Sequence, residues 1–592
     1  MENYLAYDIE TTGNKLYTTS KTFAYATYNP SEGADIRRID NENRLINVQN
    51  RQHLNRLFEN AKGKNGVPLV AHNAKFDISG AEILLSKKWR DCIRFHDTMV
   101  QSHVLQSDHP SHSLADLCWE LAKFPKDLDK KVKSLAINYD YSTVPEHIMT
   151  EYQEADVFRT SLLHEFFYPM ICKDERLKFI YDLEISLIPV TIAMEERGIT
   201  LDKDICYQLS KEYRKMALDS AQALREMTGR KVNPGSGNDA RWLLFNFAKL
   251  PVLGHTKQGL PSTQKKHIME LRENYGGEGT VIDHLMRYRS YDKGASMLAG
   301  YIDLADENGV IHPNIKTVGA TTGRESCSNP NLQNVSKETG GVNNPFPVAA
   351  RKAFRPRPGY VNIHIDYSGI EMRLLVHYSG EEEMIEIIRK GGDPHEPGCH
   401  IFYPDEYPKA NKRRKKEIRT AIKNTNFGLC YGASALQVAY LCGLGKELGT
   451  QRFREYSARF PLLAGLARRI SNRIREDGVI YTEYGRRIRC SREEPYKGTN
   501  YLIQGTAADI LKMAQCRVYH YLQDVFDGLV TILLPIHDEI IIEWPRELLP
   551  SLKYHYQEIE RLMTDFQFKV PIGIEVEVTT TNWSQVRPLT LE

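Results

Sequence analysis

Three features that would set a chain apart from ordinary globular proteins are missing from this 592-residue sequence. Its 10 cysteines include no C-x-x-C pair, which excludes the usual zinc spacing and argues against a disulfide framework. The beginning, MENYLAYDIE, has neither a basic leader nor an apolar stretch, and apolar runs such as ISLIPVTIAM are too short to span a bilayer. We therefore expect a soluble, cytoplasmic protein with no membrane partner.

An excess of charge of either sign is also absent. The chain has 78 Lys and Arg against 76 Asp and Glu, a formal net charge of +2. This balance neither requires nor excludes a nucleic-acid partner, because such binding depends on local basic stripes. Hydrophobic residues make up 41% of the chain, enough for several cores. The length is typical of roughly four domains, or of one elaborate domain.

The pattern of the sequence changes along the chain. Up to about residue 170, strand-like and helix-like stretches alternate, which indicates an α/β unit. The pattern is then mostly helical to about residue 301, with breaks at VNPGSGND and YGGEGT. Strand signals return at YVNIHIDYSG, GVIYTEYGRRIRC and FKVPIGIEVEV. Helices are expected from about residue 370 to 476 and over NYLIQGTAADILKMAQCRVYHYLQ.

Paired carboxylates occur first in LAYDIE. On a strand, Asp8 and Glu10 point to one face, where they repel each other unless a cation lies between them. Asp77 closes HNAKFD at the expected end of a strand, and Tyr152 and Asp156 lie four apart on an expected helix. Mg²⁺ or Mn²⁺ binds such carboxylates, so the set predicts a two-metal phosphodiester hydrolase whose tyrosine orients water. For the first pair alone, the solvent face of an edge strand is an equal alternative.

This set resembles the DEDD 3′–5′ exonuclease family, in the variant with a tyrosine in its third motif. The resemblance assigns Asp8 and Glu10 to the first motif, Asp77 to the second, and Tyr152 and Asp156 to the third. It implies that all five residues are catalytic, and that the four acids hold two Mg²⁺ ions.

A second constellation lies in RTAIKNTNFGLCYG, where Arg419, Lys423, Phe427 and Tyr431 recur every four residues. On a helix they form one stripe of two cations followed by two aromatic rings. The cations can bind adjacent phosphates of a triphosphate, and the rings offer flat surfaces for a sugar and a base. An amphipathic helix with a cationic, solvent-exposed end would show the same spacing.

The string R-x-x-x-K-x-x-x-F-G-x-x-Y-G resembles the nucleotide-binding fingers helix of family A DNA polymerases, the DNA polymerase I type. HIDYSGIEMRLL resembles motif A of that family, and IHDEII its motif C, which lies at a hairpin turn. The resemblance implies that Asp366 and Asp538 are catalytic metal ligands, with the carbonyl of Tyr367 near the metals. It places Lys423 at the triphosphate and Glu371 beneath the sugar, where it favours deoxyribonucleotides.

Further segments match the same family. TGRESCSNPNLQNV and NYLIQGTAADILK resemble two of its conserved strings, and His395 in GGDPHEPGCHIF matches a histidine near the triphosphate. Arg324 and Gln504 would sense the minor groove, where correct pairs of every sequence present acceptors. Singly, such residues are better explained as surface or capping residues. The full set implied for DNA binding is Arg324, Asn331, Gln333, Asn500, Gln504, His537 and Glu539, with His537 near the primer terminus and Glu539 as a secondary acid.

The sequence departs from the family pattern in four respects. We expect no 5′-nuclease domain before the first exonuclease strand, and no large thumb insertion for a processivity factor between about residues 187 and 324. Gly369 replaces a common Gln, and D-P-H-E-P-G-C replaces D-I-H-x-x-T-A. In addition, Phe427 stands where a Tyr would accept dideoxynucleotides, so poor acceptance is expected.

The predicted fold class is α/β and α+β multidomain, an RNase H-like exonuclease domain followed by a right-hand polymerase. The expected divisions are exonuclease 1–175, thumb 176–310, palm 311–380 and 486–592, and fingers 381–485 with the nucleotide-binding helix at 415–432. The predicted protein is a DNA-directed DNA polymerase with a proofreading 3′–5′ exonuclease. It uses primer–template DNA and dNTPs, with two Mg²⁺ ions per site and Mn²⁺ as a substitute.

A compact form of this kind resembles phage enzymes, so we expect a monomer that replicates a phage genome in the host cytoplasm. Replisome factors such as a helicase or a single-strand binding protein are not identifiable from the sequence. Two other functions stay open. One is a nuclease whose polymerase part only binds DNA, and the other is a non-catalytic nucleic-acid scaffold.

Overall fold

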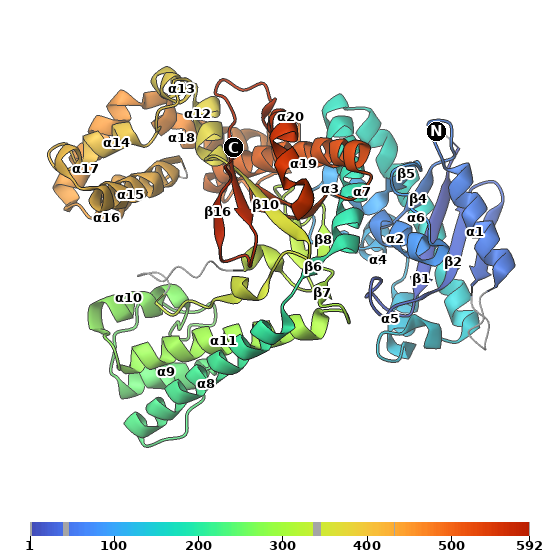
Figure 1. Cartoon of the computed structure of the whole chain (residues 1–592), viewed down its shortest axis with the longest axis horizontal. Coiled ribbons are helices and arrows are strands. Elements are labelled where there is room, and N and C mark those ends of the chain that lie inside the picture. Colours follow the sequence, from blue (N-terminus) through green and yellow to red (C-terminus); the bar gives the residue numbers. More distant parts are fainter. Residues whose placement is uncertain (1–2, 40–46, 336–344, 431, 591–592) are drawn as a thin grey trace.

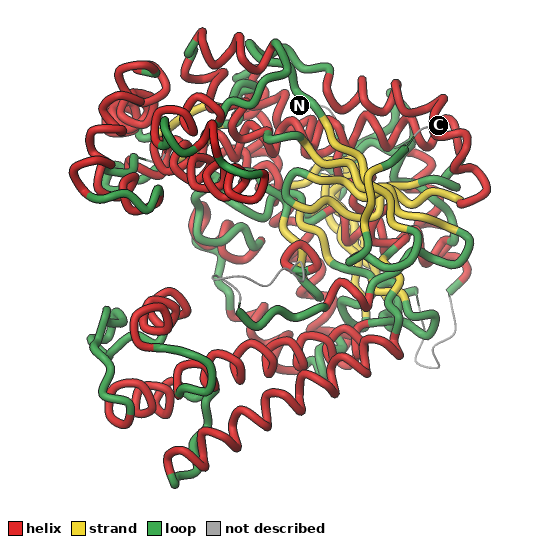
Figure 2. The backbone as a smooth tube through the Cα atoms, turned by 60° about the vertical axis from the view of Figure 1, so that its left-hand side comes forward, coloured by secondary structure: helices red, strands yellow, loops and turns green. Residues whose placement is uncertain are grey.

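The structure, a computed structural model, describes residues 3–39, 47–335, 345–430 and 432–590. Figure 1 shows an N-terminal unit in blue at the right, a helical arm in green at the lower left, a helical lobe in orange at the upper left, and a central sheet. In Figure 2 most strands lie toward the right of the view, where two separate sheets overlap, whereas the arm and the lobe are almost wholly helical. Within the described part of the chain, no helix is both long and apolar enough to cross a lipid bilayer.

The N-terminal unit is built on a five-stranded sheet of order β3-β2-β1-β4-β5. β1 pairs antiparallel with β2 and parallel with β4, so it lies inside the sheet. The strands are β1 (Leu5–Thr11), β2 (Thr22–Asn29), β3 (Gly33–Arg38), β4 (Leu69–Ala71) and β5 (Phe95–Asp97). The helices are α1 (Val48–Asn60), α2 (Ala74–Leu85), α3 (Thr98–Leu105), α4 (Leu114–Ala122), α5 (Asp127–Leu135), α6 (Glu146–Cys172) and α7 (Glu175–Arg197).

Both faces of β1 are covered. Tyr7 and Ile9 pack in the main core of the unit, with residues of α1 and α2. Ala6, on the opposite face, packs with Val157 of α6. Asp8 and Glu10 share the face of Ala6, because side chains alternate along a strand. The edge-strand alternative for this pair is therefore wrong, and the predicted strand and long helix are confirmed.

The helical arm follows α7. Its two long helices, α8 and α11, pack along each other, and a smaller core gathers Leu224, Leu243, Leu271 and Leu285 near the tip. The predicted helical character of this region is confirmed. The elements are β6 (Ile199–Thr200), α8 (Lys203–Thr228), α9 (Gly237–Arg241), a π-helix (Trp242–Phe247), α10 (Lys265–Tyr275), α11 (Val281–Leu304) and β7 (Val310–Ile311).

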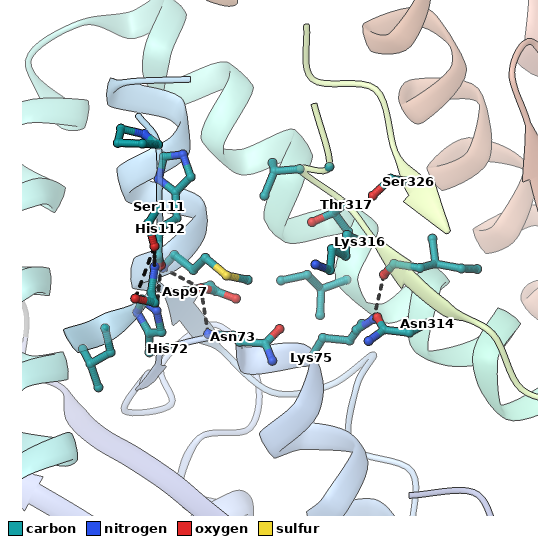
Figure 3. Close-up of a pocket in the computed structure, with 18 residues that line it drawn as sticks. His72, Asn73, Lys75, Asp97, Ser111, His112, Asn314, Lys316, Thr317 and Ser326 are labelled. Atoms are coloured by element: carbon teal, nitrogen blue, oxygen red, sulfur yellow. Dashed lines mark hydrogen bonds between the residues drawn. The ribbon is translucent and has the colours of Figure 1, made fainter. Parts of the chain in front are cut away.

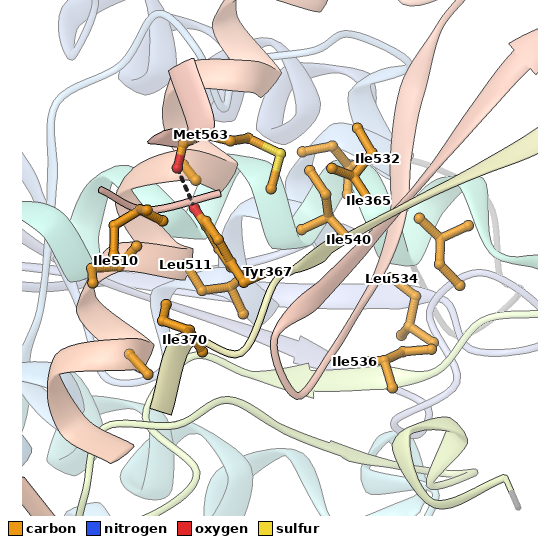
Figure 4. Packing of buried hydrophobic residues seen from close by; sticks show 14 of the residues in the cluster. Ile365, Tyr367, Ile370, Ile510, Leu511, Ile532, Leu534, Ile536, Ile540 and Met563 are labelled. Carbon is orange, nitrogen blue, oxygen red and sulfur yellow. Dashed lines mark hydrogen bonds between the residues drawn. The ribbon is translucent and has the colours of Figure 1, made fainter. Parts of the chain in front are cut away.

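The central sheet has the order β13-β14-β10-β15-β16, and β10 lies between two antiparallel neighbours. Ile365, Ile532 and Ile540 pack between this sheet and its helices (Figure 4). The strands are β10 (Tyr360–Tyr367), β13 (Thr531–Ile536), β14 (Glu539–Pro545), β15 (Ile574–Thr579) and β16 (Val586–Pro588). The flanking helices are α12 (Ile370–Ser379), α19 (Gly498–Phe526) and α20 (Leu552–Thr564). The last strand predicted begins only at Ile574, because Pro571 lacks the N–H that a strand donates.

The helical lobe lies between β10 and α19 in sequence. It consists of α13 (Glu382–Arg389), α14 (Glu396–Phe402), α15 (Lys412–Cys430), α16 (Ala435–Leu441), α17 (Lys446–Arg459) and α18 (Pro461–Asp477). Two small hairpins complete the chain, β8 (Asn314–Lys316) with β9 (Ser326–Ser328), and β11 (Val479–Tyr481) with β12 (Arg487–Arg489). The arrangement of helices and strands along this part agrees with the prediction.

Candidate active sites

The five predicted residues of the N-terminal unit line one cavity of about 650 Å³. Asp8 and Glu10 come from β1, Asp77 from α2, and Tyr152 and Asp156 from one face of α6. We call this space the acidic cavity. Three elements far apart in sequence thus bring together the residues that the motif spacing had grouped.

The sequence predicted Asp77 at the end of a strand, but the residue lies in the first turn of α2. The helix begins early because Asp97, at the end of β5, binds its first amides. Asp97 Oδ1 accepts from the Asn73 amide at 3.1 Å, and Oδ2 accepts from the Ala74 amide at 2.8 Å. Asp77 Oδ1 in turn accepts from the Ile9 amide at 3.0 Å, which ties α2 to β1. The cap lies more than 20 residues along the chain, so no local signal shows it.

Burial dominates the electrostatics of the acidic cavity. It raises the pKa values of Asp8, Glu10 and Asp77 well above the usual carboxyl range, and repulsion between neighbouring carboxylates raises them further. Burial also raises the pKa of Asp156 to about 7, although hydrogen bonds from Tyr152 and Arg159 oppose it. Four acids in this state are stabilised by any cation that enters the cavity.

The donor set of the acidic cavity fits a hard divalent cation. The Oδ2 atom of Asp8 is buried and has no hydrogen-bond partner among the described residues. Carboxylate oxygens are the ligands that Mg²⁺ and Mn²⁺ prefer. Across the described ranges, however, no three His, Cys, Asp or Glu side chains lie close enough together to hold an ion as they stand.

A second cavity, of about 700 Å³, adjoins the first, since His72 lines both. Figure 3 shows it between α2 and α3 of the N-terminal unit on one side and the strand Asn314–Lys316 on the other. Lys75 bridges the two sides, because its Nζ donates to Asn314 Oδ1 at 3.0 Å and to the Ile315 carbonyl at 2.6 Å. Burial lowers the pKa of His72 to about 4, so that this imidazole is neutral at pH 7.

Asp538 lies in a two-residue turn between β13 and β14, as the motif C resemblance implied. Ile536 pairs with Glu539, and His537 occupies the left-handed region with φ of 60°. Asp366 is the partner of Glu539 in the β10–β14 register, and the next amide, that of Tyr367, donates to the Asp538 carbonyl at 3.1 Å. The two predicted ligands therefore lie at the same end of the central sheet.

The residues around this turn differ in burial and in their partners. Asp366 is exposed, whereas Asp538 is partly buried, and burial followed by repulsion from Glu371 raises its pKa. The ring of Tyr367 is buried and its hydroxyl donates to the Met563 carbonyl at 2.7 Å (Figure 4). Only the backbone of Tyr367 is thus available at the turn. Glu539 pairs with the buried His364 at 2.5 Å, a partner that the sequence did not indicate.

The residues expected to contact DNA lie in two groups near this sheet. Arg324 pairs with Glu371 at 3.0 Å, and Gln333 Nε2 donates to the Pro535 carbonyl at 3.2 Å, beside the turn. Asn331 and His537 are exposed. On α19, Gln504 Nε2 donates to Asn500 Oδ1 at 2.7 Å, as residues four apart on a helix can.

The predicted stripe lies along α15. Arg419 and Lys423 are exposed, and Lys423 Nζ lies 5.9 Å from the ring centroid of Phe427. Arg419 is held by Asp393 through both oxygens, with Nη2 donating to Oδ1 at 3.2 Å. Tyr431, the fourth predicted member, lies outside the described residues.

His395 belongs to a buried chain of hydrogen bonds that includes Asn426 of α15. The Asn426 amide donates to His395 Nδ1 at 2.9 Å, and Tyr456 donates to Asn426 Oδ1 at 2.9 Å. Burial lowers the pKa of His395 to about 4, against the attraction of Asp393. His395 is therefore neutral at pH 7, with its proton on Nε2, because Nδ1 accepts.

These two sites lie on two separate five-stranded sheets, one in the N-terminal unit and one at the centre of the molecule. The chain matches the family described as DNA polymerase family A over residues 203–585, and that described as 3'-5' exonuclease over residues 1–171. Because the first match covers more than half of it, the chain belongs to DNA polymerase family A.

The relatives agree with this membership. DNA polymerase I of Chloroflexus aurantiacus is 29% identical over 547 residues, which are 88% of this chain and 55% of the relative. DNA polymerase I of Pseudomonas aeruginosa is 28% identical over 543 residues, 87% of this chain and 56% of the relative. The chain thus spans about half the length of these relatives.

The fold is also that of a solved structure. The POL domain of Pol1 from M. smegmatis, in complex with DNA primer-template and dNTP, superposes with a TM-score of 0.81 at 22% identity. The match covers 99% of this chain and 96% of that one. The predicted fold class is confirmed.

Proposed function

We propose that this protein is a template-directed DNA polymerase with a proofreading 3′–5′ exonuclease. Its substrates are primer–template DNA and the four dNTPs, with two Mg²⁺ ions in each site and Mn²⁺ as a substitute. The domain divisions proposed are exonuclease 1–175, thumb 176–310, palm 311–380 and 486–592, and fingers 381–485. The observation that carries the proposal is that Asp366 and Asp538 lie at the same end of the central sheet, in a family A chain.

In the polymerase site, Asp366 and Asp538 would hold the metal. The chemistry that a divalent cation held there would supply is activation of the primer 3′-hydroxyl and compensation of the charge on the triphosphate and pyrophosphate. Arg419 and Lys423 neutralise phosphate charge as the fingers close, and Lys423 donates a proton to the leaving pyrophosphate. His395, with its Nε2 proton, contributes a neutral donor beside the triphosphate.

The primer–template is held mostly through its backbone, so binding weakens as salt rises. Arg324 and Gln504 contact the minor groove at the primer end and check pair geometry. Glu371 excludes a ribose 2′-hydroxyl and thereby favours deoxyribonucleotides. Asn331, Gln333, Asn500, His537 and Glu539 support the primer terminus and the residues that contact it.

In the exonuclease site, Asp8, Glu10, Asp77 and Asp156 would hold the metal, and Tyr152 orients the attacking water. Burial raises the pKa of Tyr152 well above that of a free tyrosine, so its hydroxyl stays protonated and can donate. The second cavity, with the exposed Lys316 among its lining residues, offers a cation to a single strand that reaches the acidic cavity.

One experiment separates this function from the alternatives. Incorporation of dNTPs on a primed template, with and without Mg²⁺, is measured for wild type, Asp538→Ala and the double variant Asp8→Ala/Glu10→Ala. We expect Asp538→Ala to lose extension and keep 3′-end degradation, and the double variant to do the reverse. Wild-type extension by Asp538→Ala would refute the polymerase. If the wild type degrades 3′ ends but never extends a primer, the result favours a nuclease whose polymerase part only binds DNA. If the wild type has neither activity, the result favours a non-catalytic scaffold.

The biological setting we propose, from the resemblance to compact phage enzymes, is replication of a phage genome in the host cytoplasm. The genes that neighbour the coding sequence test this directly. Phage structural and replication genes are expected around it, and a bacterial chromosomal neighbourhood would refute it.

A further inference from the structure

A strained turn borders the acidic cavity. Ile137 and Asp140 form an antiparallel bridge, and the Asp140 amide donates to the Ile137 carbonyl at 2.9 Å. The two residues between them, Asn138 and Tyr139, both have positive φ, 53° and 64°. This is the pattern of a type I′ turn, in which the second central position is commonly Gly.

The turn is fixed from behind by polar contacts. Asp140 Oδ1 accepts from the Ser142 amide at 3.0 Å and from its hydroxyl at 2.6 Å. Thr143 Oγ1 donates to the Asp140 carbonyl at 2.7 Å, and accepts from the Ile137 amide at 3.0 Å. The base of the turn is thus rigid, and its tip presents Tyr139 in one place.

The side chain of Tyr139 makes no contact with a described residue that would offset the strain of its backbone. Its side chain is 83% exposed, the most exposed of the large hydrophobic residues in the described chain. It makes no hydrogen bond or ring contact with any residue that the structure describes. A left-handed conformation costs a non-glycine residue roughly 1–2 kcal/mol. Strain that no packing offsets is typical of residues that act on a ligand.

The ligand is indicated by the cavity that Tyr139 borders. Its lining residues include the four acids, Tyr139, Phe76 and Lys15. Lys15 can pair with a phosphate, and an exposed ring can stack with any base regardless of sequence. This combination fits a single strand of nucleic acid, rather than a duplex whose bases already stack on one another.

We infer that Tyr139 is a stacking platform that holds a base of the single-stranded 3′ end while the terminal nucleotide lies in the acidic cavity. It is a positioning residue for the exonuclease, and the inference rests on the exonuclease activity proposed above. Because a paired primer end must lose stacking in the duplex before it reaches Tyr139, the contact favours frayed and mismatched ends over paired ones.

The turn itself supplies the test, because Gly fits both of its central positions better than Tyr does. Tyr139→Gly relieves the strain, so a merely structural residue would leave the variant as stable and as active as wild type. The inference instead predicts that Tyr139→Gly loses about 5- to 150-fold in kcat/KM on a single-stranded oligonucleotide, the range of a lost base–aromatic stack. Tyr139→Phe keeps the ring and retains wild-type degradation. Ile137→Ala, an exposed residue of the same turn outside the cavity lining, is the matched control.

A second readout reports the stack itself. An oligonucleotide with 2-aminopurine near its 3′ end is bound in EDTA, so that it is not cut, and fluorescence quenching is compared between variants. Quenching by wild type and Tyr139→Phe, and its loss in Tyr139→Gly, support the inference. Unchanged quenching and degradation in Tyr139→Gly overturn it, as does loss of activity in Tyr139→Phe, which would assign the role to the hydroxyl. If wild type itself degrades no 3′ ends, the exonuclease proposal fails, and the inference fails with it.

Discussion

Arg419 already holds a carboxylate where the proposed function has it hold a phosphate. Asp393 binds it through both oxygens, and the same Asp393 Oδ1 accepts from the His395 amide at 3.0 Å. A triphosphate that arrives must compete with this internal anion. Spacing within α15 predicted that Arg419 and Lys423 share a face, but not this partner, which lies 26 residues earlier in the loop before α14.

We predict that Asp393→Asn lowers the KM for dNTPs. The amide keeps an acceptor for the His395 amide but no longer competes for Arg419 as a charge. Because Arg419 is exposed, its ion pair contributes at most about 1 kcal/mol, so a decrease of up to roughly fivefold is expected, with kcat little changed. Steady-state primer extension measures it. Glu396→Gln, an exposed acid in the same segment, is the control and should have no effect. An unchanged or raised KM in Asp393→Asn would contradict the competition.

Phe427 gives a second prediction at the level of one residue. It is partly buried on α15, one turn beyond Lys423. The resemblance to family A polymerases implies that a phenylalanine at this position disfavours substrates without a 3′-hydroxyl. We expect Phe427→Tyr to raise dideoxynucleotide use relative to deoxynucleotide use by tenfold or more, which corresponds to about 1.4 kcal/mol. Competitive incorporation of ddTTP and dTTP measures the ratio. An unchanged ratio would refute the assignment of Phe427 to the sugar.

Some elements were predictable because each contains an apolar pattern or a motif within its own sequence. These are β1, α6, β10, α15 and α19. The start of α2 was not, because Asp97 sets it across the sheet. The Oδ1 atom of Asp97 also accepts from the Met99 amide at 2.8 Å, so that one buried carboxylate caps both α2 and α3. A sequence shows a cap for the helix that follows it directly, and shows nothing for a helix that begins 23 residues earlier.

Asp97→Ala should therefore affect two helices at once. It leaves buried amides without acceptors, and we expect a loss of about 2–4 kcal/mol in unfolding free energy. Since Asp77 lies in the first turn of α2, 3′-end degradation should decrease more than primer extension does. Thermal unfolding and the two activity assays measure this. Asp97→Asn keeps one side-chain oxygen as a hydrogen-bond acceptor and should lose less unfolding free energy. Equal losses of both activities would show that the cap does not act through Asp77.

The acids around β1 predict how stability varies with pH in the absence of metal. Folded Asp156, with its pKa of about 7, keeps a proton that an unfolded aspartate loses near pH 4. The folded state thus binds more protons between these values, so stability falls as pH rises from about 4 to about 7. We expect the melting temperature in EDTA to decrease across this window, and Mg²⁺ or Mn²⁺ to restore it at pH 7.5.

Asp156→Asn should flatten this dependence and reduce the stabilisation by metal. Asp127→Asn, which changes an exposed acid of the same unit, is the control and should do neither. Differential scanning calorimetry at several pH values measures both. A melting temperature that rises with pH in EDTA would show that the acids are not held protonated by burial.

At the scale of the whole molecule, a buried ionic cluster links α7 of the N-terminal unit to α19, which flanks the central sheet. Glu184 of α7 accepts from Arg486 at 2.5 Å and from Lys512 of α19 at 2.6 Å, and Arg486 also pairs with Asp509 at 2.7 Å. All four side chains are at most 3% exposed. In sequence, the charges of α7 resemble those of any solvated helix face. Only the packing of α7 against α19 shows that Glu184 is buried.

The four paired residues comprise two anions and two cations, and this balance can be tested. Glu184→Gln leaves two buried cations beside one anion, and should lower the unfolding free energy by about 3–5 kcal/mol. The double variant Glu184→Gln/Lys512→Met removes one charge of each sign and leaves Arg486 paired with Asp509. Because removing both partners leaves no uncompensated charge, the double variant should be more stable than Glu184→Gln alone. Denaturant unfolding of the full chain, followed by fluorescence and by circular dichroism, measures the cycle. If the losses in unfolding free energy caused by the two substitutions simply add, charge balance between α7 and α19 does not stabilise the contact between these helices.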